Sequence, residues 1–438
     1  MLISIRDYTD HGIMLHMVWQ EFFIRTEPVG GTEPWNRLRE QLADFPAQGG
    51  RNIFAAWPRI DEHPGFRREL VITARQENRV VGGIAVLTGH LRLGESRLKT
   101  AFFYTPAVHP EYVKKGLGAK LLEHAWQTAA QHGFRLAWSS GHSIFEKKYG
   151  FAPLHSARNQ CITIEKSALP ACCHKSIARP IRLSDLSFVR MLHERDEQEA
   201  WGSILRTTGH FSFFWHTWKD CRIVSDLQGK MLGYYLCRIG PDSYLDILEL
   251  SSLKEDYFSE LFGQIRRHAG DAGKSSVRFF LPPAHAGLVF LSQSGCPLNI
   301  TTEKSSSRRG FAGVFALMNC ADALEDMIPE WERRLNTLDF LGKTTECTLV
   351  VARESGPWTI RSARGAVSIV PGMGANRVIL DRDEMVSLLL GNISDGEWMD
   401  HRTGHLDQDA KALVKTLFSP RIPYIWHMDR PELLTGRN

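Results

Sequence analysis

Two glycines stand at the start of an apolar helical pattern, in the stretch VHPEYVKKGLGAKLL (residues 108–122). The first N–H groups of a helix have no partner inside it and carry partial positive charge, so they can bind a phosphate group. Glycine at positions 116 and 118 would let an anion approach these donors without meeting a Cβ atom. Three lysines add positive charge around the same point: Lys114, Lys115 and Lys120. The pattern predicts a phosphate-binding helix start, and a tight turn that needs glycine only for its geometry is the alternative.

Two common nucleotide-binding motifs do not fit this stretch. A dinucleotide-binding βαβ unit needs a third glycine and an acidic residue about twenty residues later, within a parallel sheet. The strands predicted before the stretch form an antiparallel meander instead. A P-loop needs Gly-Lys-Ser or Gly-Lys-Thr, which the stretch lacks.

The elements that must position this helix start follow from hydrophobic periodicity. Alternating and β-branched runs predict strands before it, and apolar residues at three- and four-residue spacing predict a helix from Gly116 to Gly133. A further strand, a short helix and a last strand follow. In chain order, the predicted segments are ELVITA (69–74), RVVGGIAVL (79–87), RLKTAFFYTPAV (97–108), FRLAW (134–138), SIFEKKYG (143–150) and NQCITIEK (159–166).

The whole chain divides into three units. Its 438 residues correspond to about three domains of ordinary size. A segment marked by proline and cysteine (167–180) separates the first unit from a second one that repeats its order of strands and helices. From about Cys320 the pattern becomes that of an α+β domain with a single sheet. The predicted boundaries are residues 1–165, 176–319 and 320–438, and the fold class is α+β or α/β.

Taken together, these motifs resemble the acetyl-CoA-binding signature of the GNAT superfamily of N-acetyltransferases. That signature is a strand ending in V-x-P, then R/Q-x-x-G-x-G/A opening a long helix, and a later tyrosine-bearing helix that ends in G-F. This chain has Val108-His109-Pro110, the two glycines, and Gly150-Phe151 in the same order. The resemblance implies two GNAT-like mixed-sheet domains, with acetyl-CoA as the co-substrate of the first.

By the same resemblance, the backbone N–H groups at the helix start bind the pyrophosphate, and the preceding strand pairs with the pantetheine arm. Val113 stands where the signature has Arg or Gln, so a side-chain contact is missing or is supplied by a neighbouring lysine. The predicted cofactor-binding residues are Pro106, Val108, Val113, Lys114, Lys115, Gly116, Leu117, Gly118, Ala119 and Lys120.

The order of the three units resembles the enhanced intracellular survival (Eis) family, in which two GNAT domains precede a domain similar to sterol carrier protein. That resemblance implies acetylation of amines on aminoglycosides and other amine substrates, and a hexameric homo-oligomer. The second unit has no G-x-G at its helix start and carries Glu255 and Asp256 there. Because acids repel an anion, we expect this unit to be a scaffold without cofactor.

Acetyl transfer to an amine also needs a proton donor for the leaving thiolate and a base for the amine. Superfamily members commonly use a tyrosine on the later helix as the donor. Counting back from Gly150 places Glu146 at that position, whereas counting forward from Ile144 places Phe145 there. The candidate catalytic residues are therefore Glu146 and the nearby Tyr149.

Three other groups of residues have to be considered beside these candidates. In the Eis family the terminal carboxylate acts as a base, which makes Asn438 a third catalytic candidate. His109 and His142 lie near the motif and are expected to be structural or solvated. Acidic residues before the first strands could attract a cationic substrate: Glu21, Glu27 and Glu33.

Composition limits the alternatives. The net charge of +4 is small and basic residues are interspersed with acids, so we expect no nucleic-acid partner. No run of about eighteen apolar residues predicts a membrane segment, and we expect a cytoplasmic protein. The eight cysteines lack a CxxC pair, so no metal site is predicted. Two other functions stay open: a carrier of lipid or apolar ligands through the third unit, and a CoA-binding regulator without catalysis.

Overall fold

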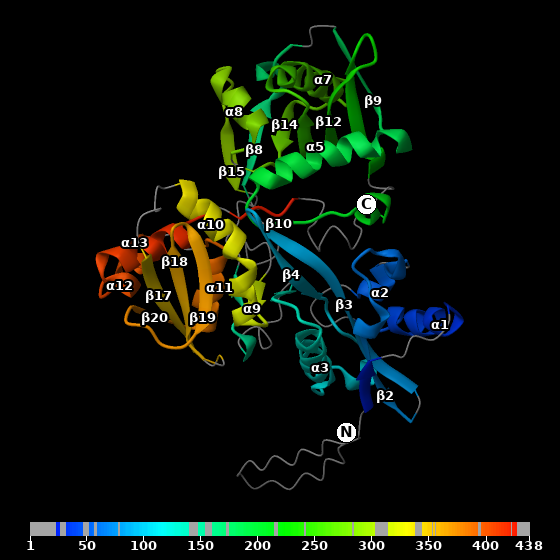
Figure 1. Cartoon of the computed structure of the whole chain (residues 1–438). Helices are drawn as coiled ribbons and strands as arrows, with labels where there is room; N and C mark the ends of the chain where they lie inside the picture. The colour runs from blue at the N-terminus through cyan, green and yellow to red at the C-terminus, as the bar shows by residue number, and fades with distance from the viewer. Residues whose placement is uncertain are drawn as a thin grey trace.

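The computed structural model forms three sheets, each with its own helices, arranged around a common centre (Figure 1). The structure describes residues 23–26, 32–46, 52–56, 59–77, 79–139, 148–153, 160–171, 175–213, 218–240, 242–282, 284–302, 314–337, 344–352, 354, 356–392, 396–421 and 423–426. The predicted α+β class with mixed sheets is confirmed. None of the helices in these ranges is long and apolar enough to cross a bilayer.

The first sheet has the order β1-β2-β3-β4-β6-β16-β7, and β5 and β10 also pair with β3. Alternate residues of β3 face opposite sides: Ile84 packs under α3, whereas Ala85 packs with α1 and α2. The strands are β1 (Phe23–Thr26), β2 (Val71–Gln76), β3 (Arg79–Leu93), β4 (Ser96–Phe103), β5 (Ala107–Val108), β6 (Leu136–Ser139), β7 (Ala152–Pro153), β10 (Ser203–Ile204) and β16 (Val314–Leu317). The helices are α1 (Thr32–Ala43), α2 (Ile53–Ala56) and α3 (Leu117–Gln131).

The second sheet has the order β15-β8-β14-β13-β12-β11-β9. Its strands are β8 (Gln160–Glu165), β9 (Ser176–Pro180), β11 (Cys221–Asp226), β12 (Met231–Ile239), β13 (Tyr244–Ser252), β14 (Ser276–Phe279) and β15 (Asn299–Thr302). Its helices are α5 (Leu186–Glu199), α6 (Thr208–Phe213), α7 (Phe258–Asp271) and α8 (Ala286–Gln293). The parallel pair β13–β14 with α7 between them repeats the pair β4–β6 with α3.

The third sheet is the predicted single sheet of the last unit, with the order β19-β18-β17-β20. Its strands are β17 (Thr344–Val351), β18 (Trp358–Ala363), β19 (Ala366–Pro371) and β20 (Arg377–Leu380). The helices are α9 (Cys320–Asp326), α10 (Ile328–Thr337), α11 (Arg382–Leu389), α12 (Gly396–Thr403) and α13 (Gln408–Leu417).

Two strands do not follow the predicted boundaries. β8 was expected to end the first unit (1–165), but it lies between β14 and β15 in the second sheet. β16 falls within the predicted second unit (176–319), but it pairs with β6 and β7 in the first sheet. An apolar run predicts that a strand forms but not which sheet edge it joins, because the partners are distant in sequence. The first two domains are therefore interleaved through β8, β10 and β16.

Candidate active site

The parallel strands β4 and β6 stop pairing just before the predicted cofactor segment. Their register runs from Thr100 opposite Leu136 to Phe103 opposite Ser139. Past that point the chain leaves β6, and β5 pairs antiparallel with β3, which places Val108 opposite Gly82. Pro106 and Val108 are buried in this segment, which connects the sheet to the start of α3.

The turn into α3 depends on backbone conformations that few residues adopt. Lys114 has φ 64° and Gly116 has φ 82°, both in the left-handed region. Apart from atoms of its own turn, no atom of the described residues lies within 4 Å of a Cβ built on Gly116. Glycine is therefore needed at position 116 because other residues rarely adopt this φ angle. The absence of a side chain also leaves the backbone open to a ligand.

The start of α3 exposes donors and positive charge together. Lys120 N donates to Gly116 O at 3.2 Å and is the first donor of the helix, so the amides of residues 117–119 have no acceptor within it. Gly116 is the N-cap, and no side chain of the described residues caps the helix. The three lysines are exposed, whereas Leu117 and Gly118 are buried. This arrangement can bind an anion through backbone N–H groups, with the lysines at its rim.

Val113 and His109 have structural positions beside this turn. Val113 packs against the core under α3. The His109 ring accepts a hydrogen bond from Glu111 N and caps the short helix Pro110–Tyr112, as expected for a structural histidine. Sequence reasoning missed Tyr112, a buried residue whose hydroxyl donates to the Gln76 side chain and ties the turn to β2.

Tyr149 is the catalytic candidate whose side chain the structure describes. Its ring stacks on Trp126 of α3 with centroids 4.2 Å apart, and Trp126 also stacks on Phe103 at the end of β4. Burial raises the pKa of the Tyr149 hydroxyl, and the neighbouring Lys148 acts in the opposite direction. The hydroxyl therefore stays protonated at neutral pH. Outside the described residues lie the other candidates Glu146 and Asn438, and also Glu21, Glu27, His142 and Phe145; Glu33 is described only as backbone of α1.

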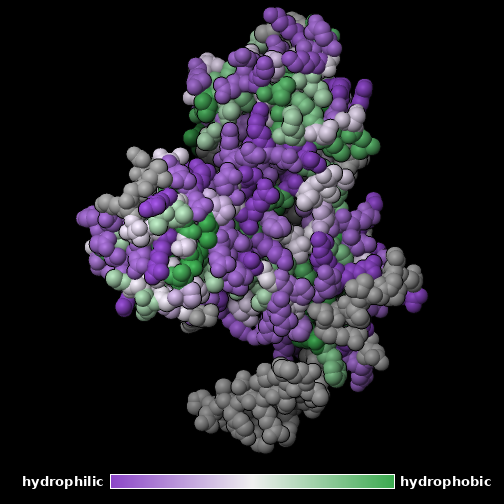
Figure 2. All heavy atoms as spheres, viewed as in Figure 1, coloured by the Kyte–Doolittle hydropathy of each residue, from purple (hydrophilic) through white to green (hydrophobic). Residues whose placement is uncertain are grey.

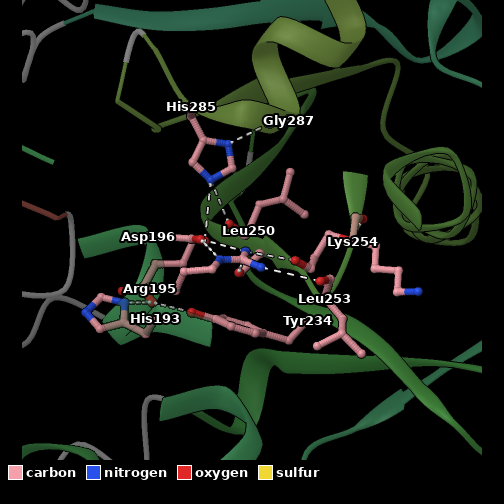
Figure 3. A network of polar contacts seen from close by, with 12 residues as sticks. His193, Arg195, Asp196, Tyr234, Leu250, Leu253, Lys254, His285 and Gly287 are labelled. Carbon is pink, nitrogen blue, oxygen red and sulfur yellow. Dashed lines mark hydrogen bonds and ion pairs between the residues drawn. The ribbon is translucent and has the colours of Figure 1, made fainter. Parts of the chain in front are cut away.

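At the corresponding place in the second domain, side chains bind the backbone carbonyls, and Figure 3 shows one of them, His285, against Leu250. β13 and β14 stop pairing at Ile247 opposite Phe279. Beyond that point the carbonyl of Leu250 accepts a hydrogen bond from His285 Nε2 at 2.9 Å, and the carbonyl of Phe280 accepts one from the Tyr424 hydroxyl at 2.5 Å. His285 Nδ1 accepts a hydrogen bond from the amide of Gly287, so the proton of the neutral ring lies on Nε2.

Burial is the main cause that lowers the pKa of His285, which keeps the ring neutral in this position. The helix α7 follows a turn with Glu255 and Asp256 and carries Glu260 in its own first turn. No sequence motif points to His285 or Tyr424, because each donates a hydrogen bond to a backbone carbonyl that is distant in the chain.

Comparisons with known proteins indicate the family of the first domain and the fold of the whole chain. Residues 32–151 match the family described as Acetyltransferase (GNAT) family. No curated protein sequence matches the chain. Among solved structures, a GCN5-related N-acetyltransferase from Anabaena variabilis superposes with a TM-score of 0.65 and 16% identity, over 92% of this chain and 99% of that one.

Two further structures are similar along nearly the whole chain. A GCN5-related N-acetyltransferase from Kribbella flavida has a TM-score of 0.64 and 14% identity, over 93% of this chain and 98% of that one. Eis1 from Mycobacterium abscessus has a TM-score of 0.58 and 13% identity, over 92% of this chain and 99% of that one. These likenesses show a shared fold. The family match, in turn, shows that residues 32–151 form a GNAT-family acetyltransferase domain, which gives the enzyme class N-acetyltransferase.

Proposed function

We propose that the first domain transfers the acetyl group of acetyl-CoA to a primary amine, either on a small cationic molecule similar to an aminoglycoside or on a lysine or peptide. The observation that carries this proposal is the start of α3, where a left-handed Gly116 and exposed lysines surround unpaired helix amides. In the proposal the pyrophosphate lies on residues 116–120, and the pantetheine arm pairs with the backbone of 106–108. Val113, Lys114 and Lys115 border the same turn.

Proton transfer to the leaving thiolate is assigned to Tyr149. A general acid must be protonated before the thioester opens, and the raised pKa of Tyr149 meets this requirement. Trp126 orients the ring by stacking on it. In the proposal Glu146 and the carboxylate of Asn438 are the candidates for the base that accepts the proton of the amine.

The three-domain layout supports an Eis-type enzyme that acts as a homo-oligomer, and a hexamer is the assembly that the resemblance implies. Figure 2 shows hydrophobic side chains on the surface of the second domain. The exposed large apolar residues in this domain are Ile177, Leu183, Met191, Leu227, Ile239, Val289 and Ile300. Light scattering coupled to size-exclusion chromatography gives the mass of the assembly and tests this point directly.

A carrier function of the third domain has less support. Its apolar side chains form a packed core, and the residues at most 1% exposed include Trp331, Leu335, Leu349, Ile360, Val378, Met385 and Leu413. A regulator that binds CoA without catalysis would share the helix start described above, so turnover has to separate it from an enzyme.

The test is titration calorimetry of acetyl-CoA with the wild-type chain, Gly118→Glu and Ser259→Glu. Both substitutions introduce a carboxylate at the second helical position, the first in α3 and the second in α7. We expect Gly118→Glu to abolish binding and Ser259→Glu to leave it unchanged. Lack of binding by the wild type contradicts the proposal.

Thiol release with a panel of aminoglycosides, polyamines and lysine peptides then identifies the acceptor class. Binding of acetyl-CoA without thiol release from any amine would instead support the regulator.

A further inference from the structure

A second candidate site lies far from the start of α3, in a cavity of about 640 Å³ between the first two domains. The β3–β4 hairpin forms one wall through His90, Arg92, Arg97 and Lys99, and α5 with the segment 205–210 forms the opposite wall. His132, next to the C-terminus of α3, also lines it. Since α3 has 15 residues, its two ends are about 20 Å apart. The cavity is therefore separate from the proposed cofactor site.

Arg92 is a buried cation in this wall without an acidic partner. Arg92 is only 6% exposed to solvent. Nε donates to the carbonyl of Gly94 at 2.8 Å, and no carboxylate among the described residues lies within ion-pair distance of the guanidinium. An arginine does not lose its proton in a protein, so burial without a counter-charge is unfavourable. A ligand that supplies the negative charge would remove this penalty.

The hairpin register gathers more positive charge beside Arg92. Arg97 lies directly opposite Arg92, and Lys99 lies directly opposite His90. Positions that differ by two share a face of the strand, so all four side chains lie on the same face of the hairpin. Like charges in direct cross-strand pairs destabilise a sheet.

The individual contacts leave this positive charge uncompensated. Lys99 Nζ donates to the carbonyl of His132 and lies 4.5 Å from the centroid of the Phe134 ring, and no carboxylate of the described residues pairs with it. Arg97 is exposed and has no ion-pair partner in the described part of the chain. Burial lowers the pKa of His90, and the nearby Lys99 and Arg97 lower it further, against the weaker effect of Asp326.

The charged groups on the opposite wall do not neutralise the hairpin. Glu194 pairs with Arg190 at 3.0 Å, and Arg206 pairs with Glu249 at 2.6 Å. Glu197, which is buried on α5, also faces the cavity. An anion would therefore bind on the hairpin side, next to the two arginines and away from α5.

We propose that this cavity binds a small anion with at least two negative charges, carried by phosphate or carboxylate groups, that bridges Arg92 and Arg97. Guanidinium groups bind both kinds of oxyanion with paired hydrogen bonds, and the volume is within the range of small-molecule sites. The strand β10, which lies between α5 and α6 in the chain, pairs with β3 at Arg92 and so joins the first sheet. A ligand here would hold the first two domains together.

Titration calorimetry on the full chain tests the proposal, with sodium pyrophosphate and sodium citrate as separate probes at matched ionic strength. The variants are Arg97→Gln, which changes an exposed side chain, and Arg92→Met, which keeps much of the buried volume. Arg364→Gln, an exposed arginine in the third domain, is the matched control. Circular dichroism confirms that each variant is folded.

We expect at least one probe to bind, and binding to weaken at least tenfold in Arg92→Met and in Arg97→Gln but not in the control. Binding of pyrophosphate but not citrate would indicate a phosphate ligand, and binding of citrate but not pyrophosphate would indicate a carboxylate ligand. Because pyrophosphate could also occupy the start of α3, each titration is repeated with Lys115→Gln, which should retain the binding. Lack of binding by both probes, undiminished binding in either cavity variant, or a loss confined to Lys115→Gln overturns the proposal.

Discussion

The helices α3 and α7 occupy the same place in two similarly ordered domains, but their first turns have opposite charge. α3 begins at the left-handed Gly116, has Ala119 at its third position and is surrounded by exposed lysines. α7 begins after Glu255 and Asp256 and has Glu260 at its third position. An anion is attracted to the first helix start and repelled by the second. The fold is thus shared, whereas the capacity to bind a phosphate depends on a few residues.

The strands beside these helices differ in a second way. In the second domain His285 and Tyr424 donate hydrogen bonds to the backbone carbonyls where the parallel strands separate. These bonds satisfy buried backbone groups and stabilise the domain, but they also close the place that a cofactor would need. In the second domain, side chains of the chain itself therefore fill the place that corresponds to the proposed cofactor position of the first domain.

The largest expected effect comes from making the first helix start resemble the second. Ala119→Glu places a carboxylate at the third position of α3, where α7 already has one. Glutamate at this position suits a helix, so the fold should persist. A like charge about 4 Å from the pyrophosphate costs about 4 kcal/mol near a protein surface. We expect acetyl-CoA binding to weaken about a thousandfold by calorimetry, and unchanged affinity would show that the cofactor binds elsewhere.

The next effect concerns proton transfer. Tyr149→Phe keeps the ring that stacks on Trp126 but removes the hydroxyl. We expect kcat to fall about 100-fold, while the KM for acetyl-CoA stays the same. Glu146→Gln is the competing variant in the same steady-state assay, since Glu146 occupies the other possible donor position. A normal kcat in Tyr149→Phe together with a large loss in Glu146→Gln would transfer the assignment to Glu146.

His285→Ala tests the scaffold role of the second domain. It removes the bond to the Leu250 carbonyl and leaves the Gly287 amide without its cap. We expect the free energy of unfolding in urea to fall by about 2 kcal/mol, with kcat/KM of the folded enzyme unchanged. His285→Asn retains a good capping side chain, so its free energy of unfolding should fall by about half as much. Reduced acetyl-CoA affinity without a loss of stability would contradict the scaffold role.

Sequence reasoning predicted the helix start of α3 because glycine spacing, lysines and apolar periodicity are local properties. It also predicted the acidic start of α7 for the same reason. It placed β8 and β16 in the wrong units, because a strand's partner depends on sheet edges distant in the chain. The positions of His285 against Leu250 and of Arg92 in the cavity also depend on long-range packing. One extra residue between Phe145 and Gly150 leaves two alignments for the proton donor, which the pattern alone cannot separate.

The smallest expected effect comes from a single lysine at the rim of the cofactor site. Lys115 is exposed, and its Nζ lies 5.6 Å from the centroid of the Tyr112 ring, so Lys115→Gln should leave the fold intact. An exposed charge pair contributes up to about 1 kcal/mol, which corresponds to roughly a fivefold rise in the dissociation constant of acetyl-CoA. The matched change in the second domain, Glu255→Gln, should have no effect. Because salt screens exposed charges, the difference between wild type and Lys115→Gln should shrink at high ionic strength. A difference that persists in high salt would mean that Lys115 contacts the phosphate at a desolvated position rather than at the rim.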